Sequence, residues 1–340
     1  MRVALDAQLT VGTATGIGEY VRGLAGALRA RGLDVVELRD PGLDPWRFDR
    51  RVLCDQVILA SRARASGATL LHCAAGTMPR NAKLPVVVTV HDLAWQAAQS
   101  HAPAYARYYF GAFSLRRYRR AARVFVDSNF TRGELLRYEP SLEPERVLVI
   151  YPGVAGDFCR LKRSSGDGRT ILVVGTVERR KNLEVLVRAL PRLGGARLVA
   201  IGPATPYASE CVALAQRLGV ESRVEMPGYV PRERLLELYA IAAVAAVPSK
   251  YEGFGYAAAQ ALCAGVPCVV ARSSSLPEIA CGDARVVDGE DVDGWADALG
   301  AALNGDADVP AAQARAGAVA RFSWKNSASA VERAYALVDR

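Results

Sequence analysis

The stretch from Val247 to Ala271 constrains the fold of this chain more than any other. It reads VPSKYEGFGYAAAQALCAGVPCVVA, which is a short apolar run, a glycine-rich loop, a helix and a second apolar run in immediate succession. The first run closes at Pro248, and the second opens directly after Gly265 and Pro267, as is typical of buried parallel strands. Two parallel strands joined by one helix form a βαβ unit, so the stretch predicts an α/β fold.

The glycine loop within this stretch predicts an anion-binding site. Glu252 sits where the first strand ends, and Gly253 and Gly255 allow the backbone to approach a ligand closely. The helix expected from about Tyr256 presents unpaired N–H groups at its start, which suit a phosphate. Glycine loops also serve turns alone, so the loop by itself leaves a purely structural role open.

Length and composition indicate two globular domains without a metal centre. A chain of 340 residues with 51% hydrophobic and 23% charged residues suits two cores. The seven cysteines are scattered and odd in number, and there are three histidines, so we expect reduced, buried cysteines and no metal site. We expect a cytoplasmic protein, because Arg2 to Leu5 begins a strand rather than a leader, and no apolar run reaches the ~20 residues of a spanning helix.

Basic residues are concentrated in the first half of the chain. Residues 1–160 hold 22 of the 43 basic residues but 15 of the 35 acidic ones, which indicates an anionic partner such as a membrane surface or a polyanion. A predicted helix over Pro103 to Arg123 carries four tyrosines, two phenylalanines and, between 116 and 123, five arginines, while residues 93–126 hold no acid. We expect its Tyr105–Arg123 part to face an anionic membrane surface. Arginines paired with acids elsewhere in the fold are the equal alternative.

The first half of the chain predicts a parallel sheet with ligand residues at its carboxyl edge. Its expected strands are listed as 3–5, 69–73, 86–90, 124–127 and 147–151. The first is followed by a turn containing Gly16 and Gly18, with a helix expected over Glu19 to Arg31. The third ends at His91, where ligands of α/β proteins bind. His72 and His101 lack such support and are interpreted as structural or incidental.

The second half repeats the pattern after an aperiodic stretch at residues 156–168. Its expected strands lie at 170–174, 198–201, 223–226, 243–247 and 268–271. After the first of them comes Arg180-Lys181, in a chain that has only five lysines. Two D-x-D matches, at Asp291 and Asp306, resemble metal-diphosphate sites, but one starts a helix and the other lies in a glycine-bounded loop, so we expect no metal there.

Several of these segments together resemble the retaining, nucleotide-sugar-dependent GT-B glycosyltransferases of family four, also called glycosyl transferases group 1. EGFGYAAAQALCAGVPCVV is similar to the family's EGFGLPxxEAMACGxPVV. Other matching segments are the TGIGEYVRGLAGAL opening, VVVTVHDLAW, VGTVERRKN, PGYV, SLPEI and Gly153 with its neighbours, over nearly the whole chain. Two positions depart from the pattern, because Gln260 replaces the second glutamate and Arg179 replaces a proline.

The resemblance implies two doubly wound Rossmann-like domains facing one another across a cleft. The expected divisions are an acceptor-side domain at 1–155, a linker at 156–168, a donor domain at 169–320 and a closing helix within 321–340 that crosses back to the first domain. It also implies transfer of a hexose, with mannose favoured, from a nucleoside diphosphate sugar to a glycan or lipid-linked acceptor with retention and without metal, as in lipopolysaccharide or other polysaccharide biosynthesis. A peripheral location on the inner face of the membrane follows from the arginine-rich helix.

The same resemblance assigns roles to individual residues. Glu252 and His91 approach the donor sugar as catalytic residues. The donor diphosphate is expected against Arg180, Lys181, Gly16, Gly18, Phe254, Gly255 and Tyr256; the ribose against Gln260; and the base against Tyr229, Val230 and Gly202. Asp6 is a weaker candidate. No nucleic acid partner and no cofactor beyond the nucleotide sugar are expected. A GT-B sugar-nucleotide epimerase and a non-enzymatic basic polyanion-binding protein stay as the alternatives.

Overall fold

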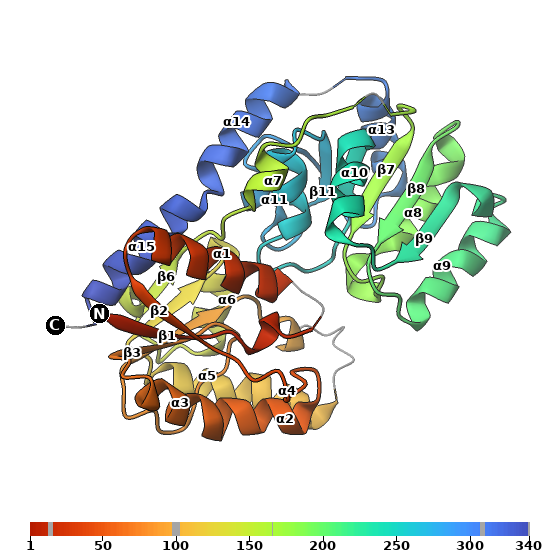
Figure 1. Cartoon of the computed structure of the whole chain (residues 1–340). Helices are drawn as coiled ribbons and strands as arrows, with labels where there is room; N and C mark the ends of the chain where they lie inside the picture. The colour runs from red at the N-terminus through yellow and green to blue at the C-terminus, as the bar shows by residue number, and fades with distance from the viewer. Residues whose placement is uncertain (13–15, 97–102, 165, 307–309, 339–340) are drawn as a thin grey trace. The chain divides into compact units, whose positions relative to one another are not determined.

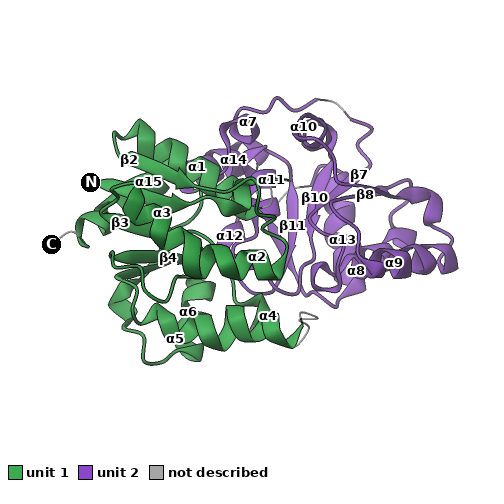
Figure 2. Ribbon diagram, turned by 60° about the horizontal axis from the view of Figure 1, so that its bottom comes forward, with its two compact units in different colours: residues 1–153, 322–340 green, residues 154–321 purple. Residues whose placement is uncertain are grey.

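The computed structural model describes residues 1–12, 16–96, 103–164, 166–306 and 310–338 of the chain. These residues form two compact units, each with its own sheet and core. Unit 1 consists of residues 1–153 and 322–340, and unit 2 of residues 154–321 (Figure 2). Among the described residues, no helix is long and apolar enough to cross a membrane.

The sheet of unit 1 is parallel throughout and has six strands in the order β2-β1-β3-β4-β5-β6. Its strands are β1 (Arg2–Asp6), β2 (Asp34–Leu38), β3 (Leu70–Cys73), β4 (Val86–Val90), β5 (Arg123–Val126) and β6 (Val147–Val149). Successive side chains of β1 enter two different cores, since Ala4 belongs to one apolar cluster and Val3 and Leu5 to the other. Both faces of the sheet are therefore buried, as in other parallel sheets.

Helices cover both faces of this sheet (Figure 1). They are η1 (Gln8–Thr10), α1 (Gly16–Ala30), α2 (Phe48–Leu53), η2 (Cys54–Ile58), α3 (Leu59–Ala65), η3 (Ala94–Gln96), α4 (Ala104–Tyr108), η4 (Tyr109–Phe113), α5 (Ser114–Tyr118), α6 (Asn129–Tyr138), η5 (Pro144–Arg146) and α15 (Trp324–Ala336). The last of these, α15, packs beside α1, and its Tyr335 hydroxyl lies 2.6 Å from Nδ1 of the buried His72. His72 therefore has a structural role, as its sequence context indicated.

Unit 2 repeats the arrangement with strand order β12-β11-β10-β7-β8-β9, again parallel throughout. Its strands are β7 (Thr170–Val174), β8 (Arg197–Ile201), β9 (Val224–Gly228), β10 (Val244–Val247), β11 (Cys268–Ala271) and β12 (Arg285–Val287). Its helices are α7 (Gly156–Cys159), η6 (Arg179–Lys181), α8 (Leu183–Ala189), η7 (Leu190–Arg192), α9 (Pro206–Arg217), η8 (Glu221–Arg223), α10 (Arg232–Ile241), α11 (Tyr256–Cys263), α12 (Leu276–Ala280), α13 (Val292–Leu303) and α14 (Ala311–Arg321). The α/β class expected from the sequence is confirmed, with one Rossmann-like sheet in each unit.

Three local expectations need correction. The sequence named no strand at β2 or β12, and both lie at sheet edges and contain only two consecutive apolar residues, Val35–Val36 and Val286–Val287. The helix expected from Glu19 begins at Gly16. Residues 156–168 group with unit 2 and contain α7, rather than forming an unstructured linker throughout.

The expected helix over Pro103 to Arg123 ends early and is irregular. It consists of α4, a π-helical turn at η4 with non-helical angles at Gly111, and α5, which ends at Tyr118. Arg123 begins β5 instead. The rings of Trp95 approach Gly111 so closely that a Cβ there would lie 2.8 Å from one of them, so the absent side chain lets the two segments pack together.

Candidate active site

The carboxyl edge of the unit 2 sheet carries the unit 2 residues that were expected to contact the donor diphosphate, whereas Gly16 and Gly18 belong to unit 1. Strand β7 pairs directly with β10, so the loops that follow them lie next to each other. The loop after β7 carries η6 with Arg180 and Lys181, and the loop after β10 carries Glu252. The two loops are also joined through the backbone, because the Lys250 amide donates to the Arg180 carbonyl over 2.8 Å.

Glu252 is the centre of this edge. Its Oε1 accepts hydrogen bonds from Lys181 Nζ at 2.5 Å and from Ser249 Oγ at 2.7 Å. Its Oε2 lies 3.3 Å from Arg180 Nη1, which also donates to the Tyr251 carbonyl over 2.7 Å. Glu252 is 9% exposed. The carboxylate therefore holds both cations at fixed positions, a positioning role that the sequence analysis did not foresee.

The charge of Glu252 is stabilised despite its burial. Burial is the largest influence and opposes ionisation, but Lys181, then Arg180, and the hydrogen bonds from Lys181 and Ser249 outweigh it and lower the pKa of Glu252. Arg180 is shared with a second acid, since its Nη2 lies 2.7 Å from Glu178 Oε1. We infer that Glu252 is ionised at neutral pH and that the two cations and the two acids nearly balance.

The backbone around η6 has conformations that fix this cluster. Asn182 follows Lys181 in the left-handed region with φ of 54°, and its side-chain amide donates to the Gly289 carbonyl over 2.8 Å. Gly175 has φ of 140°, a value that suits glycine, and a Cβ there would lie 3.4 Å from Lys181 Cε. The loop after β7 is thereby shaped so that the lysine side chain crosses it toward Glu252.

Helix α11 begins directly beside the cluster. Gly255 precedes it with φ of 98°, and a Cβ there would lie 2.8 Å from Leu276 Cδ2, so the glycine is needed for both angle and space. Phe254 is buried and packs edge-on against Tyr256, and Ser275 Oγ donates to the Phe254 carbonyl over 2.8 Å. The first N–H groups of this eight-residue helix thus follow Glu252, the partner of the two cations, by four residues along the chain.

Gln260, the expected ribose residue, lies one turn into α11. The hydroxyl of the buried Tyr239 lies 3.4 Å from Gln260 Oε1, at the long end of hydrogen-bond distances. Its side chain is half-buried rather than enclosed. The acceptor oxygen of Gln260 therefore has only a weak partner among these contacts.

The three residues expected near the base fall into two groups. Gly202 follows β8 with φ of 143°, and a Cβ there would collide with the Gly175 carbonyl, so this glycine is required by the close approach of two loops. Tyr229 and Val230 follow β9, and Tyr229 is 58% exposed. The exposed ring of Tyr229 at the carboxyl edge is free to stack on a planar ligand. The close contact with the Gly175 carbonyl explains why residue 202 is a glycine, without any role in binding.

In unit 1, Gly16 and Gly18 lie in the first turn of α1 rather than in a loop before it. A Cβ at Gly18 would lie 2.8 Å from the Leu9 carbonyl oxygen, so this glycine allows α1 to pack on η1. Asp6, the weaker candidate, is buried, accepts from the Gln8 amide at 3.0 Å and faces Arg51 at 3.7 Å. Its contacts are those of a structural residue.

His91 follows β4, as expected, and both its ring nitrogens have acceptor partners. Nδ1 lies 2.6 Å from Asp127 Oδ2, and Nε2 lies 2.8 Å from the Ala74 carbonyl. Burial opposes the charge of the imidazole, but Asp127 outweighs it, so the pKa of His91 is raised. Burial also raises the pKa of Asp127, which His91 offsets only in part. Two acceptors on one ring favour the imidazolium form.

A cavity of about 450 Å³ in unit 1 includes His91 and is rich in aromatic side chains. Its lining comprises Leu9, Ile17, Pro45, Trp46, Phe48, Arg51, Ala75, Gly76, Val90, His91, Asp92, Trp95, Tyr105, Ala106, Phe110 and Tyr118. Trp46 and Tyr105 are 60% and 57% exposed, so their rings are open to a ligand. Flat apolar rings beside a few polar groups suit the hydrophobic faces of sugars or a lipid chain.

Sequence reasoning missed Ser249 and Asp127 as partners of the named residues. Ser249 precedes Glu252 by three residues, and Asp127 directly follows β5, which pairs with β4. The strand neighbourhood was the available signal, because polar residues at the ends of adjacent parallel strands meet at one edge. Without the strand order, two residues 36 positions apart gave no indication of contact.

Neither D-x-D match forms a metal-binding group in the described residues. Asp291 caps α13 by accepting from the Gly294 amide at 2.9 Å, and Asp293 pairs with Arg192 at 2.5 Å. Residues 307–309, in the second match, lie outside the described residues, as does His101. Across the described part of the chain, no group of three or more His, Cys, Asp or Glu side chains is arranged to hold a metal ion.

Curated relatives match parts of the chain. The D-inositol 3-phosphate glycosyltransferase of Mycolicibacterium smegmatis is 32% identical over 233 residues, covering 63% of this chain and 52% of that protein. The protein of the same name from Xylanimonas cellulosilytica is 42% identical over 215 residues, covering 56% and 51%. The chain thus spans about half the length of these relatives.

Solved structures share the fold over the full chain at low sequence identity. Sucrose-phosphate synthase from Thermosynechococcus elongatus has a TM-score of 0.79 at 21% identity, covering 100% of this chain and 99% of that one. Anabaena HepE in complex with UDP-glucose has a TM-score of 0.74 at 16% identity and 99% coverage of both. These likenesses establish the two-domain fold.

Two family models match adjacent parts of the chain. Residues 14–157 match Glycosyltransferase Family 4, and residues 160–319 match Glycosyl transferases group 1. Each match falls almost entirely within one unit. With a six-stranded parallel sheet in each unit and a glycosyltransferase family model matching each unit, the chain has the GT-B fold of the family four and group 1 glycosyltransferases.

Proposed function

We propose that the chain transfers a hexose from a nucleoside diphosphate sugar to a hydroxyl acceptor. The observation that carries the proposal is the cluster of Arg180, Lys181 and Glu252 beside the N-terminus of α11. Two fixed cations and several helix N–H groups on one sheet edge form an anion site that matches a diphosphate. The two family-model matches and the relatives named as glycosyltransferases support the same assignment.

The chemical role of this cluster is to stabilise a leaving group. Breaking the bond between the anomeric carbon and the diphosphate leaves negative charge on the phosphate oxygens, and an oxocarbenium-like charge on the sugar. Lys181 and Arg180 donate to the developing phosphate charge, so the site needs no divalent ion for this step. Glu252 keeps both cations in place and supplies a negative charge near the donor. Retention at the anomeric carbon and a metal-independent reaction are part of the proposal.

The nucleoside is proposed to lie along the same edge of unit 2. Gln260 accepts from one ribose hydroxyl and donates to the other, and Tyr229 with Val230 borders the base. Because Gln260 is neutral, neither of its bonds is charge-assisted. A GDP-linked mannose is the donor that the sequence motifs favour, while UDP-linked sugars are favoured by the ligand of HepE.

The acceptor is proposed to bind in the aromatic cavity of unit 1, which includes His91. A glycan or lipid-linked acceptor fits an opening formed by Trp46, Tyr105 and Phe110. The relatives named for D-inositol 3-phosphate suggest a phosphorylated polyol as a further acceptor class. His91 is proposed to contact a sugar. The hydrogen bonds of its two ring nitrogens fix the orientation of the imidazolium ring. Attachment to an anionic membrane surface through the exposed residues of α4 and α5 completes the proposal.

Donor binding and transfer test the proposal directly. UDP-, GDP- and dTDP-sugars are screened by thermal shift in EDTA, and the sugar that stabilises the protein is then offered with candidate acceptors. We expect one nucleotide class to raise the melting temperature and to support transfer. Stabilisation by nucleic acid but by no nucleotide would favour the polyanion-binding alternative. Interconversion of the donor sugar without any acceptor would favour the epimerase.

A further inference from the structure

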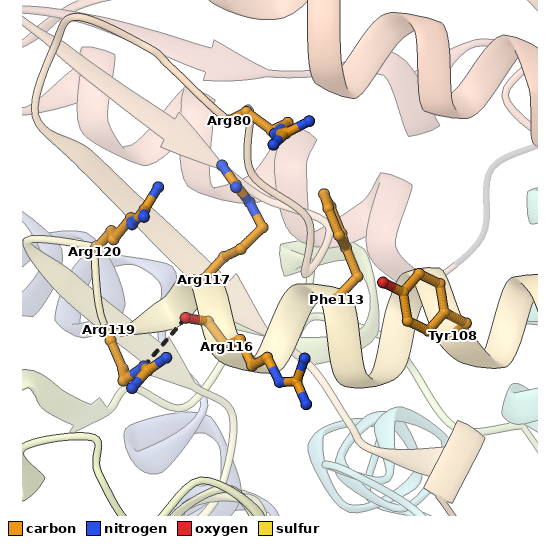
Figure 3. A pocket seen from close by; sticks show the side chains of 7 residues that line it. All are labelled: Arg80, Tyr108, Phe113, Arg116, Arg117, Arg119 and Arg120. Atoms are coloured by element: carbon orange, nitrogen blue, oxygen red, sulfur yellow. Dashed lines mark hydrogen bonds between the residues drawn. The ribbon is translucent and has the colours of Figure 1, made fainter.

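A second cavity of unit 1, the arginine pocket, has no place in the proposed reaction. It encloses about 450 Å³ and is lined by Arg80, Tyr108, Phe113, Arg116, Arg117, Arg119 and Arg120 (Figure 3). Arg80 follows β3, and the other six residues belong to α4, η4, α5 and the turn after α5. Helix α4 contributes to both cavities of unit 1. Its Tyr105 lines the aromatic cavity that includes His91, and its Tyr108 lines the arginine pocket.

No acidic side chain neutralises the pocket. Among the described residues, none of its five arginines has an ion pair with an acid within 4 Å. Many other arginines of unit 1 do pair with an acid. The nearest acids in the sequence are Asp92 and Asp127, outside the lining. Five like charges around one small cavity repel one another, and an anion removes that repulsion.

One arginine is fixed in position, and two others converge on it. Arg117 is 8% exposed, its guanidinium donates to the carbonyls of Met78 and Pro79, and its carbon lies 5.2 Å from the centre of the Phe113 ring. Burial, then Arg120 and Arg80, lowers the pKa of Arg117. Figure 3 shows Arg80 and Arg120 directed to the same region as Arg117. The electrostatic field of the pocket is therefore set by a rigid cation and two exposed ones.

We propose that the arginine pocket binds a phosphate group of a small or lipid-borne ligand, at a site separate from the donor diphosphate site of unit 2. Each planar guanidinium can donate to two oxygens of one ligand, and a phosphate group presents three terminal oxygens where a carboxylate presents two, so a phosphate can accept from several arginines at once. The volume suits a phosphorylated headgroup or a small phosphate ester rather than a polymer. The inference does not depend on the proposed sugar transfer.

Pyrophosphate is the probe that tests the site. We expect calorimetry to detect two equivalents of inorganic pyrophosphate in the wild-type protein, one in Lys181→Ala, and one in Arg80→Glu with Arg120→Glu. In the Lys181→Ala background, adding the two arginine reversals should weaken the remaining affinity at least about a hundredfold. Arg39→Glu with Arg217→Glu is the matched control, since both residues are exposed and the net charge changes equally. It should leave both equivalents.

A flotation experiment identifies where the phosphate comes from. Phosphatidylcholine vesicles containing phosphatidylinositol 4-phosphate are compared with vesicles of equal charge containing phosphatidylserine. Binding that prefers the phosphomonoester and is lost in the Arg80/Arg120 variant assigns the site to a lipid headgroup. Pyrophosphate binding without flotation assigns it to a free phosphate ester. Either result supports the phosphate site.

Three results would overturn the inference. They are the absence of a second pyrophosphate equivalent in the wild type, equal losses in the pocket and control variants, and binding of single-stranded RNA with no binding of pyrophosphate. Thermal stabilisation by the nucleotide donor is measured in the same variants and should be unchanged by Arg80→Glu with Arg120→Glu. If no nucleotide donor stabilises the protein but pyrophosphate still binds in the arginine pocket, the proposed sugar transfer is rejected and the phosphate site is retained.

Discussion

The two basic clusters of this protein differ in how their charge is balanced. In unit 2, Arg180 and Lys181 surround the nearly buried Glu252, and Arg180 also pairs with Glu178. In unit 1, the arginine pocket has no acid in its lining. The first arrangement holds its cations in defined positions before a ligand binds, but the two glutamates neutralise most of their positive charge. The second keeps its charge and gains neutralisation only from a ligand.

This difference has a consequence for affinity and specificity. A preorganised pair of cations loses little conformational entropy when a diphosphate binds, and it discriminates by geometry. An unbalanced cluster attracts anions through its net field, and salt screens the exposed part of that attraction. We therefore expect the unit 2 site to select ligands by the fixed positions of its cations, and the unit 1 site to attract anions by its net positive charge. Substitutions that change only one of these two properties should affect only one of the two sites.

The largest effect is expected from Glu252→Ala. Removing the carboxylate frees Lys181 and Arg180 from their fixed positions, so we expect transfer to fall by about 10²–10³-fold or more, the scale of losing a preorganised electrostatic group. Glu290→Ala is the control, because Glu290 pairs with Lys250 at 2.8 Å but is largely exposed. Near-normal turnover in the Glu252 variant, with an unchanged circular dichroism spectrum, would remove the central role of this residue.

Lys181→Ala should weaken donor binding by about 2–3 kcal/mol, which is about 30- to 150-fold in Kd. The lysine contributes a charge-assisted bond to the phosphate, and its loss also leaves Glu252 with one cationic partner fewer. Lys250→Ala, in which the lost partner is the exposed Glu290, should change the affinity little. Calorimetry with the stabilising nucleoside diphosphate measures both, and equal effects would show that position within the cluster is unimportant.

The Asp127–His91 pair predicts a pH-dependent contribution to stability. Because the pKa of His91 is raised in the folded protein, its stabilisation is fully present below the unfolded value of about 6.5 and is lost as pH rises through the raised value. Each pKa unit of difference corresponds to about 1.4 kcal/mol. The unfolding free energy of the wild type minus that of Asp127→Asn should therefore shrink from pH 6 toward pH 9. His72 and Asp92, which also interact electrostatically with His91, are present in both proteins, so they are not what the two proteins differ in. A constant difference would mean that His91 is neutral in the fold.

Gln260→Glu is expected to have the smallest effect, and of the opposite sign. A carboxylate accepts from ribose hydroxyls with charge assistance, so nucleotide affinity should rise several-fold to about tenfold. Gln260→Ala should weaken it only modestly, because the amide already shares its oxygen with Tyr239. Loss of binding in Gln260→Glu would show that the position faces a phosphate or an acidic acceptor group rather than a ribose.

The sequence predicted the fold class, and it named Arg180, Lys181 and Glu252 as candidate site residues, because both steps depend on short local patterns. Apolar runs closed by glycine or proline marked the buried strands, whereas the edge strands β2 and β12 were missed because each has only two consecutive apolar residues. The Arg180-Lys181 motif predicted two cations in the loop after the first strand of unit 2, and both residues lie in that loop. Their bonds to Glu252, 71 and 72 positions away, depend on β7 lying beside β10, which no local pattern contains.

The arginine-rich segment shows the opposite limit. Its composition indicated a charged surface, but one arginine of the series, Arg117, is buried against the carbonyls of Met78 and Pro79 and cannot face a membrane. The loop after β3 supplies these carbonyls and Arg80, and this loop lies far from the segment in sequence. Composition therefore predicted the charge of the region, and tertiary packing decided that part of it forms a pocket. A charge reversal that includes Arg117 would test folding rather than binding.

Binding of a nucleoside diphosphate in EDTA tests the central claim most directly. The protein, its Lys181→Ala variant and the Arg80/Arg120 double variant are titrated with UDP, GDP and dTDP in excess EDTA, and with the same nucleotides in Mg²⁺. Our account predicts one preferred nucleotide that binds equally well in both conditions, to the wild type and the pocket variant alike, and much more weakly to Lys181→Ala. Strict dependence on Mg²⁺, or equal binding by Lys181→Ala, would contradict it.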